Sequence, residues 1–172
     1  MIAGVITTSD RGFRGEREDD SGPVLLKILE EQNWFRDIKY KLVPDEKEMI
    51  REAILEFTKD CNLILTTGGT GISPRDLTPE VTRELIEKEV PGIPEEMRRK
   101  SREITPHAIL SRSVAGIRGK CLIINLPGSP HGAKENLEAI INVIPHALKL
   151  IRGEVKDCRE EVGSVHNKAL SK

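Results

Sequence analysis

The sequence NLILTTGGTGISPRD, residues 62–76, joins a short apolar run directly to a glycine-rich turn. Asn62 to Thr67 is predicted to be a buried strand because the run is apolar and is bounded by turn residues. Glycines at 68, 69 and 71 would let backbone N–H groups approach an anion, and a helix after Asp76 would add its positive dipole end. The stretch therefore predicts a strand, an anion-binding loop and a helix in succession.

Similar units recur along the rest of the chain. Apolar runs of strand length are at residues 2–8, 38–43 and 120–126, in addition to 62–67. Helical patterns begin at Ser21 and recur at residues 45–59, 78–89, 94–103, 107–112 and 133–151. Strands that alternate with helices indicate parallel βαβ units with helices on both faces of a sheet.

Length and charge restrict the class of protein. The 172 residues suffice for one hydrophobic core, so we expect one domain over residues 1–152 and a polar tail over 153–172. Lys and Arg number 27 against 28 Asp and Glu, a net charge of −1, which argues against a general binder of nucleic acid or membranes. Neither a signal peptide nor a run of about 18 apolar residues is apparent, so we expect a cytoplasmic protein.

Polar segments follow four of the predicted strands. They are at residues 8–11, 44–46, 67–71 and 127–130. Because the carboxyl ends of parallel strands meet at one edge of a sheet, ligands bind there. The sequence therefore predicts a binding site where these four segments converge.

The glycine-rich loop matches neither of the two common phosphate motifs. Gly71 is not followed by the Lys and Ser or Thr of a P-loop, no G-x-G-x-x-G is present, and a tight structural turn would use the same residues. Asp76 after the loop and Asp45 at a neighbouring strand end could hold Mg²⁺, a hard cation that prefers oxygen ligands and phosphates. The alternative is that both aspartates cap helices, and for Asp45 alone we favour capping, at the start of the helix expected from residue 45.

Other polar residues admit structural explanations. The basic run at residues 98–102 is typical of a solvated helix face, and Ser111 and Arg112 could bind phosphate or simply form a turn. The four histidines lack the spacing of a zinc site, and no G-x-S-x-G elbow is present. Cys61, Cys121 and Cys158 form no C-x-x-C pair and are expected to be structural.

Seven segments carry a family resemblance. They are SDR (9–11), DSGP (20–23), VPDE (43–46), TTGGTG (66–71), PRDLTPE (74–80), LSR (110–112) and LPGSP (126–130). Together they resemble the molybdopterin adenylyltransferases of molybdenum-cofactor biosynthesis, a domain that also forms part of gephyrin and of the plant molybdenum-insertion protein. The resemblance covers roughly residues 1–152. Thr67 and Ser129 depart from it, because relatives can carry an apolar residue at the first position and Asn or Gln at the second.

The resemblance implies a fold, an assembly and a reaction. The fold is a three-layer α/β/α sandwich with a mostly parallel central sheet, and the assembly is a homotrimer with a molybdenum-insertion enzyme as a partner. In the reaction the terminal phosphate of molybdopterin attacks the α-phosphate of ATP, with Mg²⁺, and the products are adenylylated molybdopterin and pyrophosphate.

Site residues follow from the same resemblance. The family's functional positions fall on Asp45, Thr70, Asp76, Ser101 and Ser111. Asp45 and Asp76 are expected to be catalytic and to hold Mg²⁺ against the ATP phosphates, although either could instead contact the pterin ring. Ser101 and Ser111 are assigned to the phosphate of the pterin substrate. The remaining residues expected to bind substrate or phosphate are Ser9, Asp10, Thr67, Gly68, Gly69, Gly71, Arg112, Pro127 and Gly128.

Three other functions remain open at this point. A paralogue could bind molybdopterin without adenylylating it, although the presence of both Asp45 and Asp76 counts against that. A non-catalytic assembly module would leave the two aspartates dispensable and would release no pyrophosphate. A generic nucleotide-binding domain would act on another substrate.

Overall fold

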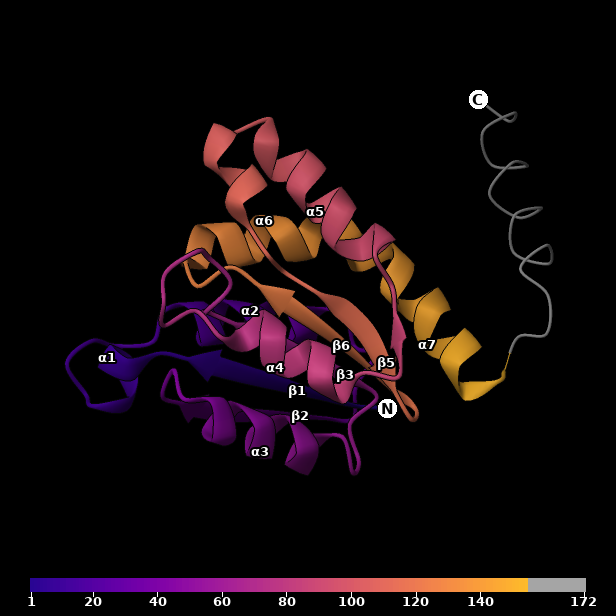
Figure 1. Cartoon of the computed structure of the whole chain (residues 1–172). Helices are drawn as coiled ribbons and strands as arrows, with labels where there is room; N and C mark the ends of the chain where they lie inside the picture. The colour runs from indigo at the N-terminus through magenta and orange to yellow at the C-terminus, as the bar shows by residue number, and fades with distance from the viewer. Residues whose placement is uncertain (155–172) are drawn as a thin grey trace.

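A six-stranded sheet lies between two layers of helices in the computed structural model, which describes residues 1–154 (Figure 1). The strands are β1 Ile2–Thr8, β2 Asp37–Val43, β3 Leu63–Thr67, β4 Lys88–Glu89, β5 Ala115–Arg118 and β6 Cys121–Leu126. Their order is β2-β1-β3-β6-β5-β4. Strands β2, β1, β3 and β6 are parallel, whereas β5 pairs antiparallel with β6 and β4 pairs antiparallel with β5. The predicted α/β sandwich with a mostly parallel sheet is confirmed.

The described residues form seven α-helices and two 3₁₀ turns. They are α1 Asp10–Phe13, α2 Ser21–Glu31, α3 Lys47–Phe57, α4 Thr78–Leu85, α5 Gly92–Arg102, η1 Pro106–Leu110, α6 Pro130–Ile140, η2 Ile141–Val143 and α7 Ile144–Arg152. Helices α2, α5, α6 and α7 pack on one face, and α3 and α4 pack on the other.

Alternating side chains of the central strands feed both hydrophobic cores. In β3, Leu63 and Leu65 belong to the core under α2 and α6, whereas Ile64 belongs to the core under α3 and α4. Successive residues of a strand point to opposite faces, so a strand covered on both faces must be apolar throughout. This constraint explains why the runs at 62–67 and 120–126 read as almost continuously apolar.

Two sequence expectations about helices are wrong. The helix expected over residues 78–89 ends at Leu85, because Ile86 is extended (ψ 147°) and the next residues form β4, which pairs with β5. The single helix expected over 133–151 is divided into α6 and α7 by η2. Pro145, in the first turn of α7, explains the break, because proline has no N–H and its ring clashes with the carbonyl four residues earlier.

Other expectations have mixed outcomes. Cys61 and Cys121 are buried free thiols, as predicted, whereas Cys158 and most of the expected tail lie outside the described residues. Within residues 1–154, no helix is long and apolar enough to cross a lipid bilayer.

Four strand ends meet at one edge of the sheet, as predicted. The register pairs Thr8 with Val43, Thr7 with Thr67, and Thr67 with Leu126. Buried Asn125 fixes helix α4 against this edge, since its Nδ2 donates to Thr66 Oγ1 at 2.9 Å and to Thr82 Oγ1 at 2.8 Å. The loops that follow β1, β2, β3 and β6 therefore share one rim.

Candidate active site

The glycine-rich loop after β3 passes too close to its neighbours to carry side chains. Gly68 has φ +104° and Gly69 has φ +62°, in the left-handed region that favours glycine. A Cβ atom on Gly68 would lie 2.3 Å from the Thr8 carbonyl oxygen, and one on Gly69 would lie 2.5 Å from Thr78 Oγ1. The Gly68 N–H donates to Leu126 O at 3.2 Å, so the loop is attached to β6 as well as to β1.

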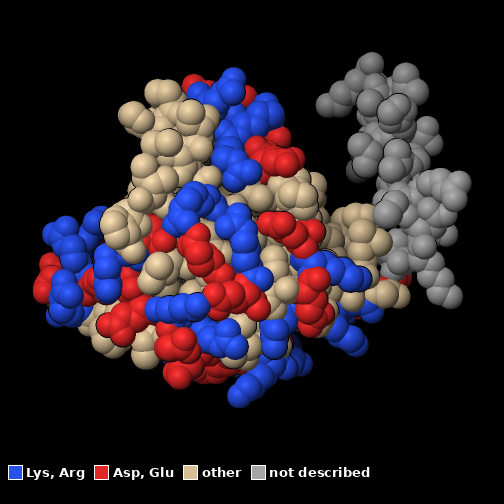
Figure 2. Space-filling view, in the orientation of Figure 1, with Lys and Arg blue, Asp and Glu red and all other residues tan. Residues whose placement is uncertain are grey.

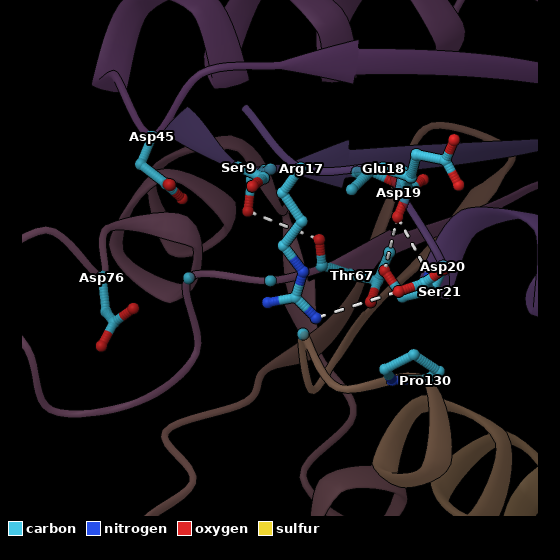
Figure 3. A pocket seen from close by; sticks show the side chains of 15 residues that line it. Ser9, Arg17, Glu18, Asp19, Asp20, Ser21, Asp45, Thr67, Asp76 and Pro130 are labelled. Carbon is cyan, nitrogen blue, oxygen red and sulfur yellow. Dashed lines mark hydrogen bonds and ion pairs between the residues drawn. The ribbon is translucent and has the colours of Figure 1, made fainter. Parts of the chain in front are cut away.

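A polar pocket of about 200 Å³ opens on one side of this loop (Figure 3). It contains seven of the predicted site residues, namely Ser9, Asp45, Thr67, Gly68, Gly69, Asp76 and Gly128. Thr67 has a structural task here, because its hydroxyl donates to Pro127 O at 2.7 Å and ties β3 to the loop after β6. The structure thus brings residues from four strand ends to one cavity.

The carboxylates of Asp45 and Asp10 each accept a hydrogen bond from the backbone N–H of the other residue. The Asp10 N–H donates to Asp45 Oδ2 at 2.9 Å, and the Asp45 N–H donates to Asp10 Oδ1 at 3.0 Å. Asp45 does not cap a helix, because α3 begins at Lys47 with Glu46 as its N-cap. The expectation that Asp45 is an N-cap is wrong, since the carboxylate joins the loops after β1 and β2 instead.

Burial, hydrogen bonds and nearby charges shift the pKa of the Asp45 carboxyl in opposite directions. Burial raises its pKa above the ordinary value, the N–H of Asp10 partly lowers it, and the negative charges of Asp10 and Asp76 raise it further. Asp10 has a lowered pKa because the Arg75 guanidinium binds it at 2.6 Å. The ionised form of Asp45 is therefore stabilised by any cation that enters the pocket.

Asp76 also fails to cap the helix that follows it. Leu77 occupies the N-cap position of α4, and Asp76 Oδ2 instead accepts the Ser73 N–H at 2.8 Å. The carboxylate lies beside Gly71, where an added Cβ would be 2.9 Å from Asp76 Oδ2. Capping, the structural alternative for this residue, is wrong.

Asp45 and Asp76 are suited to holding a metal ion whose remaining ligands are water and the phosphates of a substrate. Within residues 1–154 no group of three or more His, Cys, Asp and Glu side chains could hold a metal ion by itself. Mg²⁺ in phosphoryl-transfer sites usually takes only one or two carboxylates and completes its shell with water and substrate phosphates. Two carboxylates that line one pocket fit that arrangement.

Several residues of the polar pocket were not identified as site residues from the sequence. They come from the end of β1, from the segment that leads into α2 and from the start of α6, and are Thr7, Thr8, Arg17, Glu18, Asp19, Asp20, Ser21 and Pro130. Asp19 organises this segment by accepting hydrogen bonds from Tyr40 Oη at 2.6 Å and from Thr7 Oγ1 at 2.7 Å. Its burial raises its pKa, but these bonds and those from residues 21 and 22 lower it by more. The motif DSGP at residues 20–23, which begins directly after Asp19, was the sequence signal that could have identified this segment.

A second pocket, of about 530 Å³ and with a mainly apolar surface, is lined by the next residues of the glycine-rich loop and is called the apolar pocket below. It contains the other predicted residues Thr70, Gly71, Ser101, Ser111 and Pro127, with apolar walls from Ile72, Ile104 and Leu110. The buried Ser101 hydroxyl accepts Asn136 Nδ2 at 2.9 Å, and the hydroxyls of Ser111 and Ser113 are 2.9 Å apart. The loop thus lines two pockets of different character, the first through Gly68 and Gly69 and the second through Thr70 and Gly71.

Asp10 and Arg112 are the predicted site residues that line neither pocket. Asp10 binds Arg75, as described above, and Arg112 directs its guanidinium to carbonyl groups of the loop. The basic run on α5 is mainly a solvated face, as expected, because Arg99 and Lys100 form exposed ion pairs with Glu96 of the same helix and with Glu103 at its C-cap. Arg98 differs, since its Nη1 reaches Ser111 O and Ser113 O at 3.5 Å.

Comparison with known proteins supports one family. A family model described as a probable molybdopterin binding domain matches residues 4–146. The molybdopterin adenylyltransferase of Helicobacter pylori J99 is 42% identical over 161 residues, which are 92% of each chain. Gephyrin of Dictyostelium discoideum is 44% identical over 93% of this chain, but the chain spans only 24% of gephyrin. The structure of the molybdopterin biosynthesis enzyme MoaB from Thermus thermophilus is 50% identical, with TM-score 0.81, and the match covers 88% of this chain and 96% of that one.

The raised pKa of Asp45 predicts that its charge costs stability in the ligand-free protein. A carboxyl whose pKa is raised by folding stabilises the fold below its unfolded pKa, and that contribution is lost as pH rises through the folded value. Asp45→Asn keeps an acceptor for Asp10 N–H and removes the charge. We expect the variant to be more stable at pH 7, by about 1 kcal/mol or less, and the difference to vanish below about pH 4.

Thermal unfolding between pH 3.5 and 8 measures this difference. Asp37→Asn, at an exposed carboxylate that begins β2, is the matched control and should not gain stability at pH 7. An Asp45→Asn protein that is less stable than the parent at pH 7 would contradict the electrostatic account.

Proposed function

The chain belongs to the family of molybdopterin-binding domains of molybdenum-cofactor biosynthesis, and from this premise we propose that it is a molybdopterin adenylyltransferase. In this reaction AMP passes from ATP to the terminal phosphate of molybdopterin, and pyrophosphate is released. The observation that carries the proposal is that one glycine-rich loop lines two pockets, a polar one through Gly68 and Gly69 and an apolar one through Thr70 and Gly71. Two substrates bound in these pockets would bring their phosphates together beside the loop.

The character of each pocket suggests which substrate it takes. A triphosphate requires N–H donors and cations, which favours the polar pocket beside Gly69, Asp45 and Asp76. A pterin ring is flat and requires apolar walls with a few polar groups, which favours the pocket of Ile72, Ile104 and Leu110. Ser101 and Ser111, in the apolar pocket, would then bind the pterin's phosphate.

The glycine-rich loop would hold phosphate through fewer N–H groups than the sequence predicts. The Gly68 N–H already donates to Leu126 O at 3.2 Å. The phosphate cradle would therefore be made by the N–H groups from Gly69 onward, and Gly68 would serve to bring the loop close to β1 and β6.

Charge in the polar pocket favours a metal-dependent reaction. Its lining includes five carboxylates, Glu18, Asp19, Asp20, Asp45 and Asp76, and among the described lining residues Arg17 is the single Lys or Arg. Arg17 extends across the cavity, and its Nη2 lies 3.9 Å from Asp20 Oδ2 (Figure 3). A triphosphate would be repelled by these carboxylates unless cations were present. Mg²⁺ held by Asp45 and Asp76 would supply charge neutralisation at the phosphates.

Adenylyl transfer then requires little covalent catalysis by the protein. A phosphate oxygen of molybdopterin forms a bond to the α-phosphorus of ATP, the bond from that phosphorus to the bridging oxygen of the β-phosphate breaks, and pyrophosphate carries away the electron pair. Such transfers depend mainly on in-line positioning and on stabilising the charge of the transition state. Residues of both pockets would hold the two phosphates in line with each other beside the glycine-rich loop.

We propose that the chain works as a homotrimer. Ile109, in η1, is 62% exposed, and it lies outside the apolar pocket. Figure 2 shows intermixed charges over much of the molecule and an uncharged surface above them, over η1. Exposed apolar groups of this kind are often buried by a symmetry mate.

We also propose that the functional domain ends near residue 152, where α7 ends at Arg152 before Gly153 in a left-handed conformation. The cytoplasm, which supplies ATP, is the proposed compartment. A molybdenum-insertion enzyme is the proposed partner, because an adenylylated intermediate must be consumed by a step that removes AMP.

Pyrophosphate release tests the proposed function. With ATP, Mg²⁺ and molybdopterin, the protein should release pyrophosphate, and omission of the pterin should abolish the release. Asp76→Asn removes one negative charge near the phosphates and should lower kcat by about a hundredfold, or about 3 kcal/mol of transition-state stabilisation. Asp37→Asn should leave kcat unchanged.

Two results would reject parts of this assignment. Binding of molybdopterin without pyrophosphate release would favour a non-catalytic paralogue or an assembly module. Near-normal release by a folded Asp76→Asn protein would remove Asp76 from the catalytic machinery.

Sedimentation equilibrium tests the trimer. Micromolar protein should give a mass three times that of the 19.2 kDa chain, and the mass should fall on dilution according to a monomer–trimer equilibrium. A monomer at all concentrations would contradict the assembly.

A further inference from the structure

The guanidinium of Arg112 joins the two ends of the loop that carries Asp76. Nε donates to Gly71 O at 2.6 Å, and Nη2 donates to Asp76 O at 2.7 Å. The backbone N–H of Arg112 adds a bond to Thr70 O at 2.9 Å. One residue therefore closes the segment 71–76, whose middle residues 72–75 are exposed to solvent.

Glu80, in the first turn of α4, completes the arrangement. Its Oε1 pairs with Arg112 Nη1, while its Oε2 is buried with no hydrogen-bond partner. Removal of the guanidinium would leave this half-buried carboxylate uncompensated, a costly state. Arg112 is therefore held from α4 as well as from the loop.

These contacts argue against a direct role of Arg112 on a phosphate. Each of the three guanidinium nitrogens already donates to Gly71, Asp76 or Glu80. A move toward a phosphate would break those bonds and release the loop. In addition, Arg112 lines neither pocket.

We propose that Arg112 is a positioning residue that acts through Asp76 by keeping the segment 71–76 in its reactive arrangement. The proposal rests on the proposed adenylyl transfer and changes the role expected for Arg112 from the sequence. Arg112 directly follows Ser111, which lines the apolar pocket, so it also joins the proposed pterin pocket to the Asp76 side of the polar pocket. A planar guanidinium can hold two carbonyls and a carboxylate at fixed angles, whereas an ammonium group on a flexible stem cannot.

Arg112→Lys tests this role because it keeps the charge and loses the rigid fork. Arg118→Lys is the matched control, since Arg118 also donates to a backbone carbonyl, Leu85 O at 2.7 Å, but lines neither pocket. We expect Arg112→Lys to lower kcat by roughly 10- to 100-fold while the Kd for molybdopterin changes less than about twofold, and Arg118→Lys to change neither.

A double-mutant cycle separates positioning from general stability. If Arg112 acts through Asp76, Arg112→Lys should have little further effect on kcat in an Asp76→Asn background. Independent, multiplicative losses in the double variant would overturn the proposal. A raised Kd for molybdopterin with normal kcat would also overturn it, in favour of direct phosphate binding.

Amide hydrogen exchange supplies a readout that needs no activity. In Arg112→Lys, exchange at residues 71–76 should become faster, while exchange in β3 and β6 stays as in the parent. Unchanged exchange at 71–76 would overturn the proposal. If the parent protein released no pyrophosphate, the proposed function would fail, and hydrogen exchange would still decide whether Arg112 holds the loop.

Discussion

The close passage of the Gly68–Gly69 backbone between β1 and β6 is the constraint on which the site depends. A Cβ atom on Gly68 would meet the Thr8 carbonyl oxygen at 2.3 Å, and Gly128 approaches so closely that its own added Cβ would lie 3.1 Å from the Gly68 Cα atom. The loops after three strands therefore touch without intervening side chains. That contact, together with the hydrogen bonds between Asp10 and Asp45, brings Asp45 and Asp76 to one cavity although they belong to loops on different strands.

The same loop also contributes to two environments. Five carboxylates and Arg17 line a small polar cavity at Gly68 and Gly69, and Ile72, Ile104 and Leu110 line part of a larger cavity at Thr70 and Gly71. This geometry suits a reaction between two phosphates, each bound in the environment that its attached group requires. It also means that the segment 71–76, exposed on its outer side, must be held from within, and Arg112 meets that need.

The sequence predicts the edge at which the site lies better than it predicts individual contacts. Strand ends could be found because β3 and β6 are buried on both faces and read as apolar runs. Strands β4 and β5 were missed because they have two and four residues and little apolar pattern. Asp45 was expected to cap a helix because local spacing cannot show that its partner is Asp10, 35 residues away. Asp19 was missed for the same reason, since Tyr40 Oη reaches it from 21 residues away.

A crystal structure with α,β-methylene-ATP, Mg²⁺ and molybdopterin would test the central claim most directly. This analogue cannot release pyrophosphate, so both substrates would remain bound. The account predicts the triphosphate in the polar pocket with Mg²⁺ between it and Asp45 and Asp76, the pterin in the apolar pocket, and the two phosphates meeting at the loop from Gly69 to Gly71. A nucleotide in the apolar pocket, or a metal ion away from both aspartates, would contradict it.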